Sequence, residues 1–314
     1  MAKTAFLFPG QGSQRVGMAE DLYREFAWVR ELFEMAEEVT RLHLARLCFQ
    51  GPMEELTQTV NLQPAVTVVN LACLGLLRRE GIAGEAAAGH SLGEYSALHA
   101  AGVIGAEDTV RLVFERGRLM HREALAHPGA MHALIGLTID AVQEIVAEAQ
   151  AAGPVAVANH NTETQIVITG APAGVERAAA LAAARGAKAV PLKVSGAWHS
   201  ELMRGAEAEF RACLAAAAFA PPRGKLVLNV TGDWAPEDPE ALRGIMTRQL
   251  CSPVRWHDAM RALIAFGVDT VVEVGPGNVL AGLMRKILPR DSSVRVLPMD
   301  GLRAFEALQR VLAG

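Results

Sequence analysis

The chain has 314 residues, of which 51% are hydrophobic and 20% are charged. This length and composition predict one large domain, or one large and one small domain, and they exclude a disordered protein. The formal net charge is −4, and aromatic residues make up only 5% of the chain. Both values argue against nucleic acid as a partner, because basic surfaces and aromatic rings for base stacking would be scarce.

The cysteines and the N-terminal residues are typical of a protein in a reducing compartment. The cysteines are Cys48, Cys73, Cys213 and Cys251, and no two of them have C-x-x-C spacing. We therefore predict neither a metal site nor a redox site, and we expect free thiols in the cytoplasm. The apolar run Ala5–Phe8 is too short for a signal peptide, and we expect no membrane-spanning segment and no membrane partner.

The first part of the chain shows strand and helix patterns in turn. Ala5–Phe8 predicts a buried first strand, and Pro9–Gln14 predicts a tight, exposed loop after it. Helical patterns follow at 18–35, 65–79, 93–101 and 106–125. Pro64 stands where a proline suits the first turn of the second of these helices.

A different order of elements begins near residue 127. The predicted elements are a strand (130–137), a helix (139–151), two strands (155–158 and 165–169) around a polar turn at 159–163, a helix (174–185) and a strand (188–194). This β-α-β-β-α-β order is that of a ferredoxin-like fold. We therefore predict that residues 127–195 form a small inserted subdomain.

The rest of the chain returns to the first pattern. Residues 201–218 are predicted to form a helix, and 227–229 and 270–274 to form strands. Strands that alternate with helices favour a mostly parallel sheet with covered faces. The predicted fold class is therefore α/β, with a large domain formed by residues 1–126 and 196–314.

The pentapeptide Gly89-His90-Ser91-Leu92-Gly93 has the pattern G-x-S-x-G between a small apolar stretch and a helical one. Such a serine can lie on a sharp strand-to-helix turn, with its hydroxyl exposed at the end of a sheet. The main-chain N–H of Leu92 would then face the oxyanion formed on an acyl group attached to Ser91. The motif predicts acyl chemistry through a serine ester.

A serine nucleophile needs a base to take its proton. His199 directly follows the predicted subdomain and could reach a cleft between the two domains, where active sites are common. An acid would complete a triad, but no aspartate stands out. The order serine, acid, histidine of α/β-hydrolases leaves a second arrangement open, Asp233 or Asp238 with His257.

Two further positions fit acyl chemistry. Gln11 lies between two glycines after the first strand, and its main-chain N–H could be a second oxyanion donor. A phosphate-binding turn is the alternative, but neither a third glycine nor a Walker lysine follows. Arg116 lies on an otherwise apolar helix face. If it is buried near Ser91, it needs a carboxylate partner, which a dicarboxylate half-ester would supply.

Five motifs occur together in the chain. They are Phe8–Gln14 (FPGQGSQ), Gly89–Tyr95 (GHSLGEY), Arg116-Gly117, Val194–Ser200 (VSGAWHS) and Glu273–Gly277 (EVGPG). With these motifs the chain resembles, nearly end to end, the malonyl-CoA:acyl-carrier-protein transacylases of bacterial fatty-acid synthesis and the acyltransferase domains of polyketide synthases. The resemblance implies an α/β-hydrolase-like large domain with an inserted ferredoxin-like subdomain.

The resemblance also implies catalytic roles. Ser91 would be the acylated nucleophile and His199 its base, with the main-chain N–H groups of Gln11 and Leu92 as the oxyanion hole. The main-chain carbonyl of Gln249 would orient the histidine, which would explain the missing triad acid.

Other positions are implied to bind the substrate. Arg116 would pair with the free malonyl carboxylate. Gln63 and Asn159 would line the substrate cleft, and His90 would also bind the substrate. Trp198 stands where the family often has Phe, or Ser in methylmalonyl-selective domains. Its bulky ring beside the acyl pocket predicts selectivity for malonyl over methylmalonyl groups.

The implied reaction is a ping-pong transfer from malonyl-CoA to the phosphopantetheine thiol of holo acyl carrier protein, by a monomeric cytoplasmic enzyme without a cofactor. The alternatives are a trans-acting polyketide-synthase acyltransferase, a serine thioesterase or acyl hydrolase of the same fold, and a non-catalytic docking protein. The carrier protein of this family is acidic, so we expect a local basic patch. Its candidates are Arg185 with Lys188, Lys193, and Arg285 with Lys286.

Overall fold

The computed structural model describes residues 3–313 and contains two separate sheets. The larger sheet has the strand order β7-β2-β1-β8-β9, and all neighbouring strands are parallel. Its strands are β1 (Thr4–Phe8), β2 (Ala86–Gly89), β7 (Lys225–Val227), β8 (Thr270–Val274) and β9 (Arg295–Met299). The predicted α/β fold with a mostly parallel sheet is confirmed.

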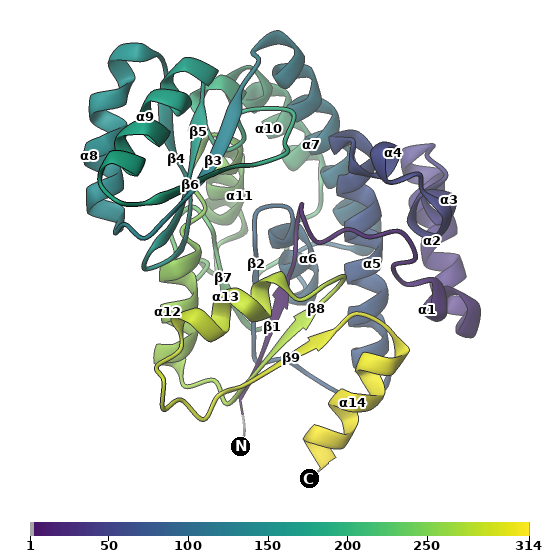
Figure 1. The fold of residues 1–314 in the computed structure, drawn as a ribbon. Coiled ribbons are helices and arrows are strands. Elements are labelled where there is room, and N and C mark those ends of the chain that lie inside the picture. Colours follow the sequence, from purple (N-terminus) through teal and green to yellow (C-terminus); the bar gives the residue numbers. More distant parts are fainter. Residues whose placement is uncertain (1–2, 314) are drawn as a thin grey trace.

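Helices cover both faces of the larger sheet, as Figure 1 shows for α5 on one side and α12 on the other. Alternate residues of β1 point to opposite faces, so Phe6 and Phe8 join one core and Ala5 and Leu7 the other. The helices outside the small subdomain are α1 (Glu20–Glu25), α2 (Ala27–Thr40), α3 (Leu44–Gln50), α4 (Met53–Thr57), α5 (Thr59–Arg79), α6 (Gly93–Ala100), α7 (Ala106–Ala126), α10 (Glu207–Ala216), α11 (Pro239–Arg248), α12 (Trp256–Phe266), α13 (Val279–Ile287) and α14 (Leu302–Ala313).

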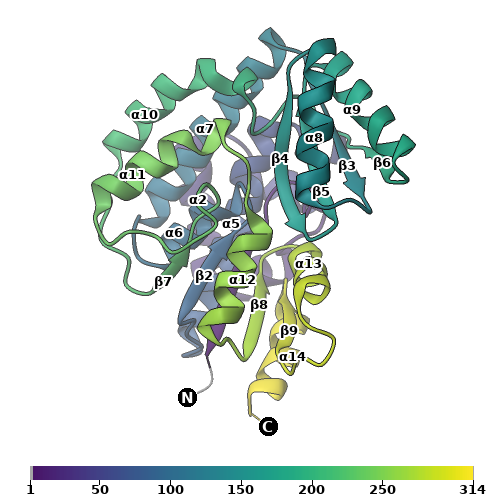
Figure 2. The same ribbon diagram turned by 90° about the vertical axis from the view of Figure 1, so that its left-hand side faces the viewer.

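The smaller sheet has the strand order β4-β5-β3-β6 and is antiparallel. It consists of β3 (Ala130–Ile135), β4 (Val155–Thr162), β5 (Gln165–Gly170) and β6 (Lys188–Pro191), with the helices α8 (Ile139–Ala149) and α9 (Pro172–Ala184). Figure 2 shows this unit above α12 and α13. Its apolar core is separate from those of the larger sheet. The ferredoxin-like element order is thus confirmed, and we call this unit the small subdomain and the remainder the large domain.

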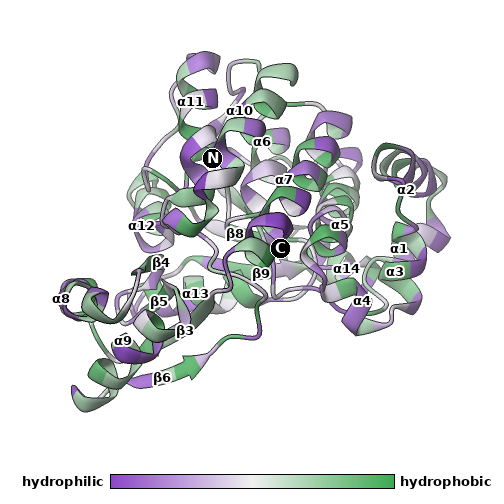
Figure 3. Cartoon of the chain, turned by 90° about the horizontal axis from the view of Figure 1, so that it is seen from above, coloured by the Kyte–Doolittle hydropathy of each residue, from purple (hydrophilic) through white to green (hydrophobic). Residues whose placement is uncertain are grey.

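The outer helices are amphipathic. Seen from above, α8 and α10 show both hydrophilic and hydrophobic residues (Figure 3). In α2, the residues Val29, Phe33 and Ala36 recur at helical spacing and are buried. Three short 3₁₀ helices complete the fold, η1 (Gln150–Ala152), η2 (Glu201–Ala206) and η3 (Gln249–Cys251).

Helix α5 corrects one expectation. It begins at Thr59, so Pro64 lies inside it instead of in its first turn, and the missing proline N–H leaves the Val60 carbonyl without its helical donor. The helix is also long and apolar enough to cross a membrane, although no such segment was expected. However, 89% of its most apolar window is buried inside the protein, as in the core helix of a soluble protein.

Two other boundaries differ from the prediction. The helix expected over 18–35 is two helices, because Phe26 has an extended backbone between α1 and α2. The polar segment expected as a turn at 159–163 belongs mostly to β4, which continues to Thr162. Its polar residues Asn159 and Asn161 are buried, since this end of the strand lies against the large domain and the candidate site.

Candidate active site

The turn that carries Ser91 joins β2 to α6 at the C-terminal end of the larger sheet. Ser91 has a φ of +52°, in the left-handed region that residues with a side chain rarely adopt. A Cβ on Gly93 would lie 1.9 Å from the Phe8 carbonyl oxygen, so only glycine allows α6 to start this close to β1. The turn thus has the strained strand–turn–helix geometry that the G-x-S-x-G motif requires.

His199 lies opposite this turn. Its Nε2 is 2.7 Å from Ser91 Oγ, although the two residues are 108 positions apart. Its Nδ1 is 3.1 Å from the Gln249 carbonyl oxygen and 3.0 Å from the Ser252 carbonyl oxygen. Two carbonyl acceptors require a proton on Nδ1, so Nε2 is left as an acceptor for the serine proton.

The surroundings of His199 keep it neutral. Its side chain is buried, and burial together with the nearby charge of Arg116 lowers its pKa to about 3. An imidazole with such a pKa is unprotonated at neutral pH and can accept a proton. His199 can therefore accept a proton without a carboxylate partner.

Arg116 is a cation at the bottom of the site and is only 1% exposed. It comes from α7 and donates hydrogen bonds to Gln249 Oε1 (3.1 Å), Gln63 Oε1 (2.9 Å) and Ser91 Oγ (3.1 Å). Burial lowers the pKa of Arg116, but a guanidinium stays charged at neutral pH. Within residues 3–313 no carboxylate lies within ion-pair distance of it, so its positive charge is free to meet an anionic ligand.

Glu94 and Asn229 support the turn, and the sequence analysis missed both. Asn229 Oδ1 accepts the Ser91 N–H at 2.7 Å, and its Nδ2 donates to the Gly89 carbonyl at 2.7 Å. Glu94 accepts hydrogen bonds from the Asn229 N–H (2.7 Å) and from Gln249 Nε2 (2.5 Å). A carboxyl group in the first turn of a buried helix was the available signal for Glu94. Asn229 has no local signal in the sequence.

The pKa of Glu94 reflects two opposed effects. Burial raises it to about 7, while the donated hydrogen bonds and the charge of Arg116 favour the carboxylate. Gln249 connects Glu94 with Arg116, because its Nε2 donates to Glu94 and its Oε1 accepts from Arg116. The side chain of Gln249 therefore fixes Arg116, while its main-chain carbonyl contacts His199.

The loop after β1 packs against the turn that carries Ser91. A Cβ on Gly10 would lie 2.6 Å from the His90 carbonyl oxygen, which shows how closely the two loops approach. Gln11 and Leu92 both line the pocket around Ser91. In the described part of the chain, neither the Gln11 nor the Leu92 main-chain N–H donates a hydrogen bond, so both are available to an oxyanion.

A small pocket of about 110 Å³ opens at Ser91 between the two domains. Its lining includes the predicted residues His90, Asn159 and Trp198, and also Met120, Met131, Leu192 and Val194. His90 Nε2 lies 2.9 Å from Asn161 Oδ1, so the small subdomain contacts the residue that precedes Ser91. The Trp198 ring is buried, and its bulk narrows the space beside Ser91.

Not every predicted residue lines this pocket. Gln63 is buried behind Arg116 and accepts its hydrogen bond, because α5 packs directly under α7. The alternative acid–histidine pair does not form. Asp238 caps the N-terminus of α11 through the N–H groups of Glu240 and Ala241, and His257 lies beside His160.

The family of acyl transferase domains matches this chain over residues 5–301. This chain belongs to that family. It is 42% identical over 298 residues to the malonyl CoA-acyl carrier protein transacylase of Bacillus subtilis, and the match covers 94% of each chain.

Two solved structures of acyltransferases have nearly the same fold. An acyl carrier protein S-malonyltransferase from Vibrio cholerae is 38% identical, with a TM-score of 0.92 over 98% of this chain and 100% of that one. A malonyl-transacylase solved in complex with a holo type II polyketide-synthase acyl carrier protein is 37% identical. It also has a TM-score of 0.92, over 98% of this chain and 100% of its own.

Proposed function

We propose that this chain is a malonyl-CoA:acyl-carrier-protein S-malonyltransferase of fatty-acid synthesis. The observation that carries the proposal is the position of Arg116, a buried cation 3.1 Å from Ser91 Oγ with no carboxylate partner within residues 3–313. In a malonyl thioester, a single CH₂ separates the reacting carbonyl from the free carboxylate. A cation beside the nucleophile itself therefore meets that carboxylate, and a bidentate ion pair would hold the acyl group in place.

In the first half-reaction, His199 Nε2 takes the proton of Ser91 Oγ as the oxygen attacks the thioester carbonyl of malonyl-CoA. The main-chain N–H groups of Gln11 and Leu92 stabilise the oxyanion of the tetrahedral intermediate. When the intermediate collapses, the carbon–sulfur bond breaks and the CoA sulfur receives the proton from His199. The product is a malonyl ester on Ser91.

In the second half-reaction, His199 takes the proton from the phosphopantetheine thiol of the acyl carrier protein. The sulfur attacks the ester carbonyl, and Ser91 Oγ leaves with the proton that His199 returns. The chemistry needs only the chain's own residues, the CoA thioester as substrate and the phosphopantetheine of the partner. We place the reaction in the cytoplasm, carried out by a monomer, without nucleic acid or membrane as a partner.

Two alternatives make different demands on the site. A thioesterase for neutral acyl groups has no use for an unpaired buried cation, so Arg116 favours malonyl transfer. A transferase of polyketide synthesis would use the same residues, and one related structure is bound to a polyketide carrier protein. Loading rates on a fatty-acid and a polyketide carrier protein, measured side by side, distinguish the two pathways.

The experiment that tests the proposal is intact-mass spectrometry after brief mixing with malonyl-CoA, followed by addition of holo carrier protein. We expect a malonyl adduct on the wild type but not on Ser91→Ala, and we expect the adduct to move to the carrier. Decay of the adduct to free malonate without a loaded carrier would indicate a hydrolase. Absence of any adduct, also with acetyl-CoA and methylmalonyl-CoA, would support a non-catalytic protein.

A further inference from the structure

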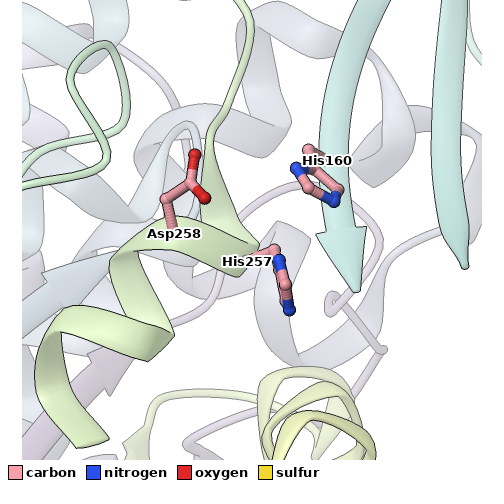
Figure 4. Close-up of side chains that lie close together, drawn as sticks. All are labelled: His160, His257 and Asp258. Atoms are coloured by element: carbon pink, nitrogen blue, oxygen red, sulfur yellow. The ribbon is translucent and has the colours of Figure 1, made fainter. Parts of the chain in front are cut away.

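A group of potential metal ligands lies outside the active site, where the two domains meet. His160 on β4 and His257 and Asp258 on α12 each offer one donor atom, and these atoms lie within 4.8 Å of one another. Figure 4 shows His160 on the strand, and His257 and Asp258 side by side at the start of the helix with their side chains extending in different directions. No other group of three His, Cys, Asp or Glu residues within 3–313 has such spacing.

His160 has a nitrogen without a partner. Its Nε2 is shielded from solvent and makes no hydrogen bond within the described residues. Its ring lies against that of His257, with 4.8 Å between centroids and 47° between planes. A buried polar atom without a partner costs free energy, and a ligand bound to this nitrogen would remove that cost.

The group borders an open pocket of about 660 Å³ that both domains form. The small subdomain contributes Ile139, His160 and Glu163, and the large domain contributes His257 and Asp258. The pocket leaves room for an ion and for a water molecule as a further ligand.

The surroundings of the two histidines and of Asp258 bear on their ability to bind an ion. Burial lowers the pKa of His160 and of His257, and the two rings also lie close together, which disfavours a charge on His160. A neutral imidazole is the form of histidine that binds a metal. Asp258 Oδ2 accepts a hydrogen bond from Arg255 Nε at 2.9 Å, which leaves Oδ1 available.

We propose that His160, His257 and Asp258 form a Zn²⁺ site that joins the two domains. Two imidazole nitrogens and a carboxylate oxygen form a ligand set that Zn²⁺ accepts, with water in the fourth tetrahedral position. Ligand atoms around such an ion lie about 3.3 Å apart. Small side-chain rotations would bring the three donor atoms from their present spacing of up to 4.8 Å to this distance. Mg²⁺ and Ca²⁺ prefer oxygen ligands and are disfavoured by the two imidazoles.

The bound ion would be a structural link. The two domains already touch here, because the His160 N–H donates to the Val254 carbonyl (2.9 Å) and the Val254 N–H to the Ala158 carbonyl (2.8 Å). Val254 lies two residues after Ser252, whose carbonyl accepts a hydrogen bond from His199 Nδ1. The ion would therefore stabilise the segment that orients the base without contacting the base itself. This inference does not depend on the proposed function.

Titration of the reduced, chelator-treated full chain with Zn²⁺ tests the site. We expect one zinc ion to bind to the wild type and to His43→Ala, a control at an exposed histidine of the large domain. His257→Ala and His160→Ala should bind that ion at least about tenfold more weakly, since even changes next to the direct ligands cost this much. Equal stoichiometry and affinity in all four proteins would overturn the proposal.

Two further measurements remain informative if a variant folds poorly. In the wild type, Zn²⁺ should raise the Tm, because an ion that binds only the folded chain stabilises it. Zn²⁺ should also protect His257 from modification by diethyl pyrocarbonate. Reaction of His257 at the same rate with and without saturating Zn²⁺ would refute the site without any substitution. A Tm increase that persists in His257→Ala would place the zinc elsewhere.

Discussion

Arg116 is a buried cation whose side-chain hydrogen bonds all go to neutral groups. We expect Arg116→Ala to lower kcat/KM for malonyl-CoA by at least about a hundredfold, because a charge-assisted bidentate pair contributes about 3 kcal/mol. Transfer of an acetyl group, which has no carboxylate, should fall far less. Steady-state assays with both thioesters measure the difference.

A matched control for this prediction is Arg111→Ala. Arg111 lies on the same helix, but it is exposed and pairs with Glu107. Its loss should leave both activities near the wild-type values. If Arg116→Ala reduces acetyl and malonyl transfer equally, the arginine positions Ser91 instead of binding the malonyl carboxylate.

His199 gives a prediction about pH. Its pKa of about 3 in the folded chain lies below the ordinary value of about 6.5, so between these two values the unfolded chain binds the extra proton. The contribution of His199 to the free energy of unfolding is therefore complete above pH 6.5 and decreases as the pH falls toward 3. An NMR titration should show one imidazole that stays neutral well below pH 6. Its assignment follows from the resonance lost in His199→Ala, and a midpoint near 6.5 for that resonance would contradict the prediction.

Trp198 gives a prediction about acyl selectivity. Its ring lines the pocket beside Ser91 and leaves little space for an α-methyl group. We expect Trp198→Ser to shift the ratio of kcat/KM values toward methylmalonyl-CoA by about 1–3 kcal/mol, or roughly 10- to 200-fold. Trp198→Phe should give a smaller shift. A ratio that stays unchanged in a Trp198→Ser protein with a native circular dichroism spectrum would show that another group sets the selectivity.

The sequence was most informative about residues whose environment is local. Ser91 could be predicted because the adjacent glycines and the helical pattern after it are enough to specify the turn. Asn229 could not be predicted, because its contacts to Ser91 and Gly89 join residues about 140 positions apart. Gln63 was predicted at the substrate cleft, but its place behind Arg116 depends on how α5 and α7 pack.

The turn between β2 and α6 depends on the close approach of α6 to β1. We expect Gly93→Ala to lower the free energy of unfolding by about 1–3 kcal/mol, because the new Cβ would overlap the Phe8 carbonyl and the backbone would have to shift. Urea denaturation measures the change. Gly244→Ala is the control, since Gly244 lies in α11 with open space around it and alanine favours a helix. Similar stabilities for both variants would mean that the turn tolerates a side chain.

The element boundaries that could not be predicted have physical causes. Phe26 interrupts a helical pattern without any glycine or proline, because its half-buried side chain packs against the core and its backbone is extended there. The segment 159–162 was expected as a turn since it is polar. It is a strand because its asparagines are buried by residues of the large domain and the candidate site. The break at Phe26 and the strand at 159–162 both depend on tertiary contacts rather than on the secondary-structure preference of the local sequence.

The whole molecule is acidic, so binding of an acidic carrier protein needs a local positive charge. Arg185 is already paired with Glu144 and Glu148, whereas Lys193 is exposed between Leu192 and Val194 at the mouth of the pocket. Of the predicted basic residues, we therefore expect Lys193 to matter most for docking.

Lys193→Glu should raise KM for the carrier protein several-fold at low salt and leave KM for malonyl-CoA nearly unchanged. The difference should shrink at high ionic strength, because exposed charges are screened. Lys225→Glu is the control, because Lys225 begins β7 and so lies at the end of the larger sheet opposite to Ser91. KM values measured over a series of salt concentrations test this, and a KM that does not respond to salt in either variant would argue against electrostatic docking.

The two carbonyl groups that hold His199 have a consequence for how the site can change during evolution. An aspartate that orients a histidine can be lost through a single codon change, but a main-chain carbonyl is present whatever residue stands at its position. Substitutions at Ser252 can therefore keep the acceptor as long as the backbone path is kept. The orientation of His199 is encoded in the course of the chain around η3 and not in the identity of one acidic side chain, so this part of the site should tolerate sequence drift that a triad would not.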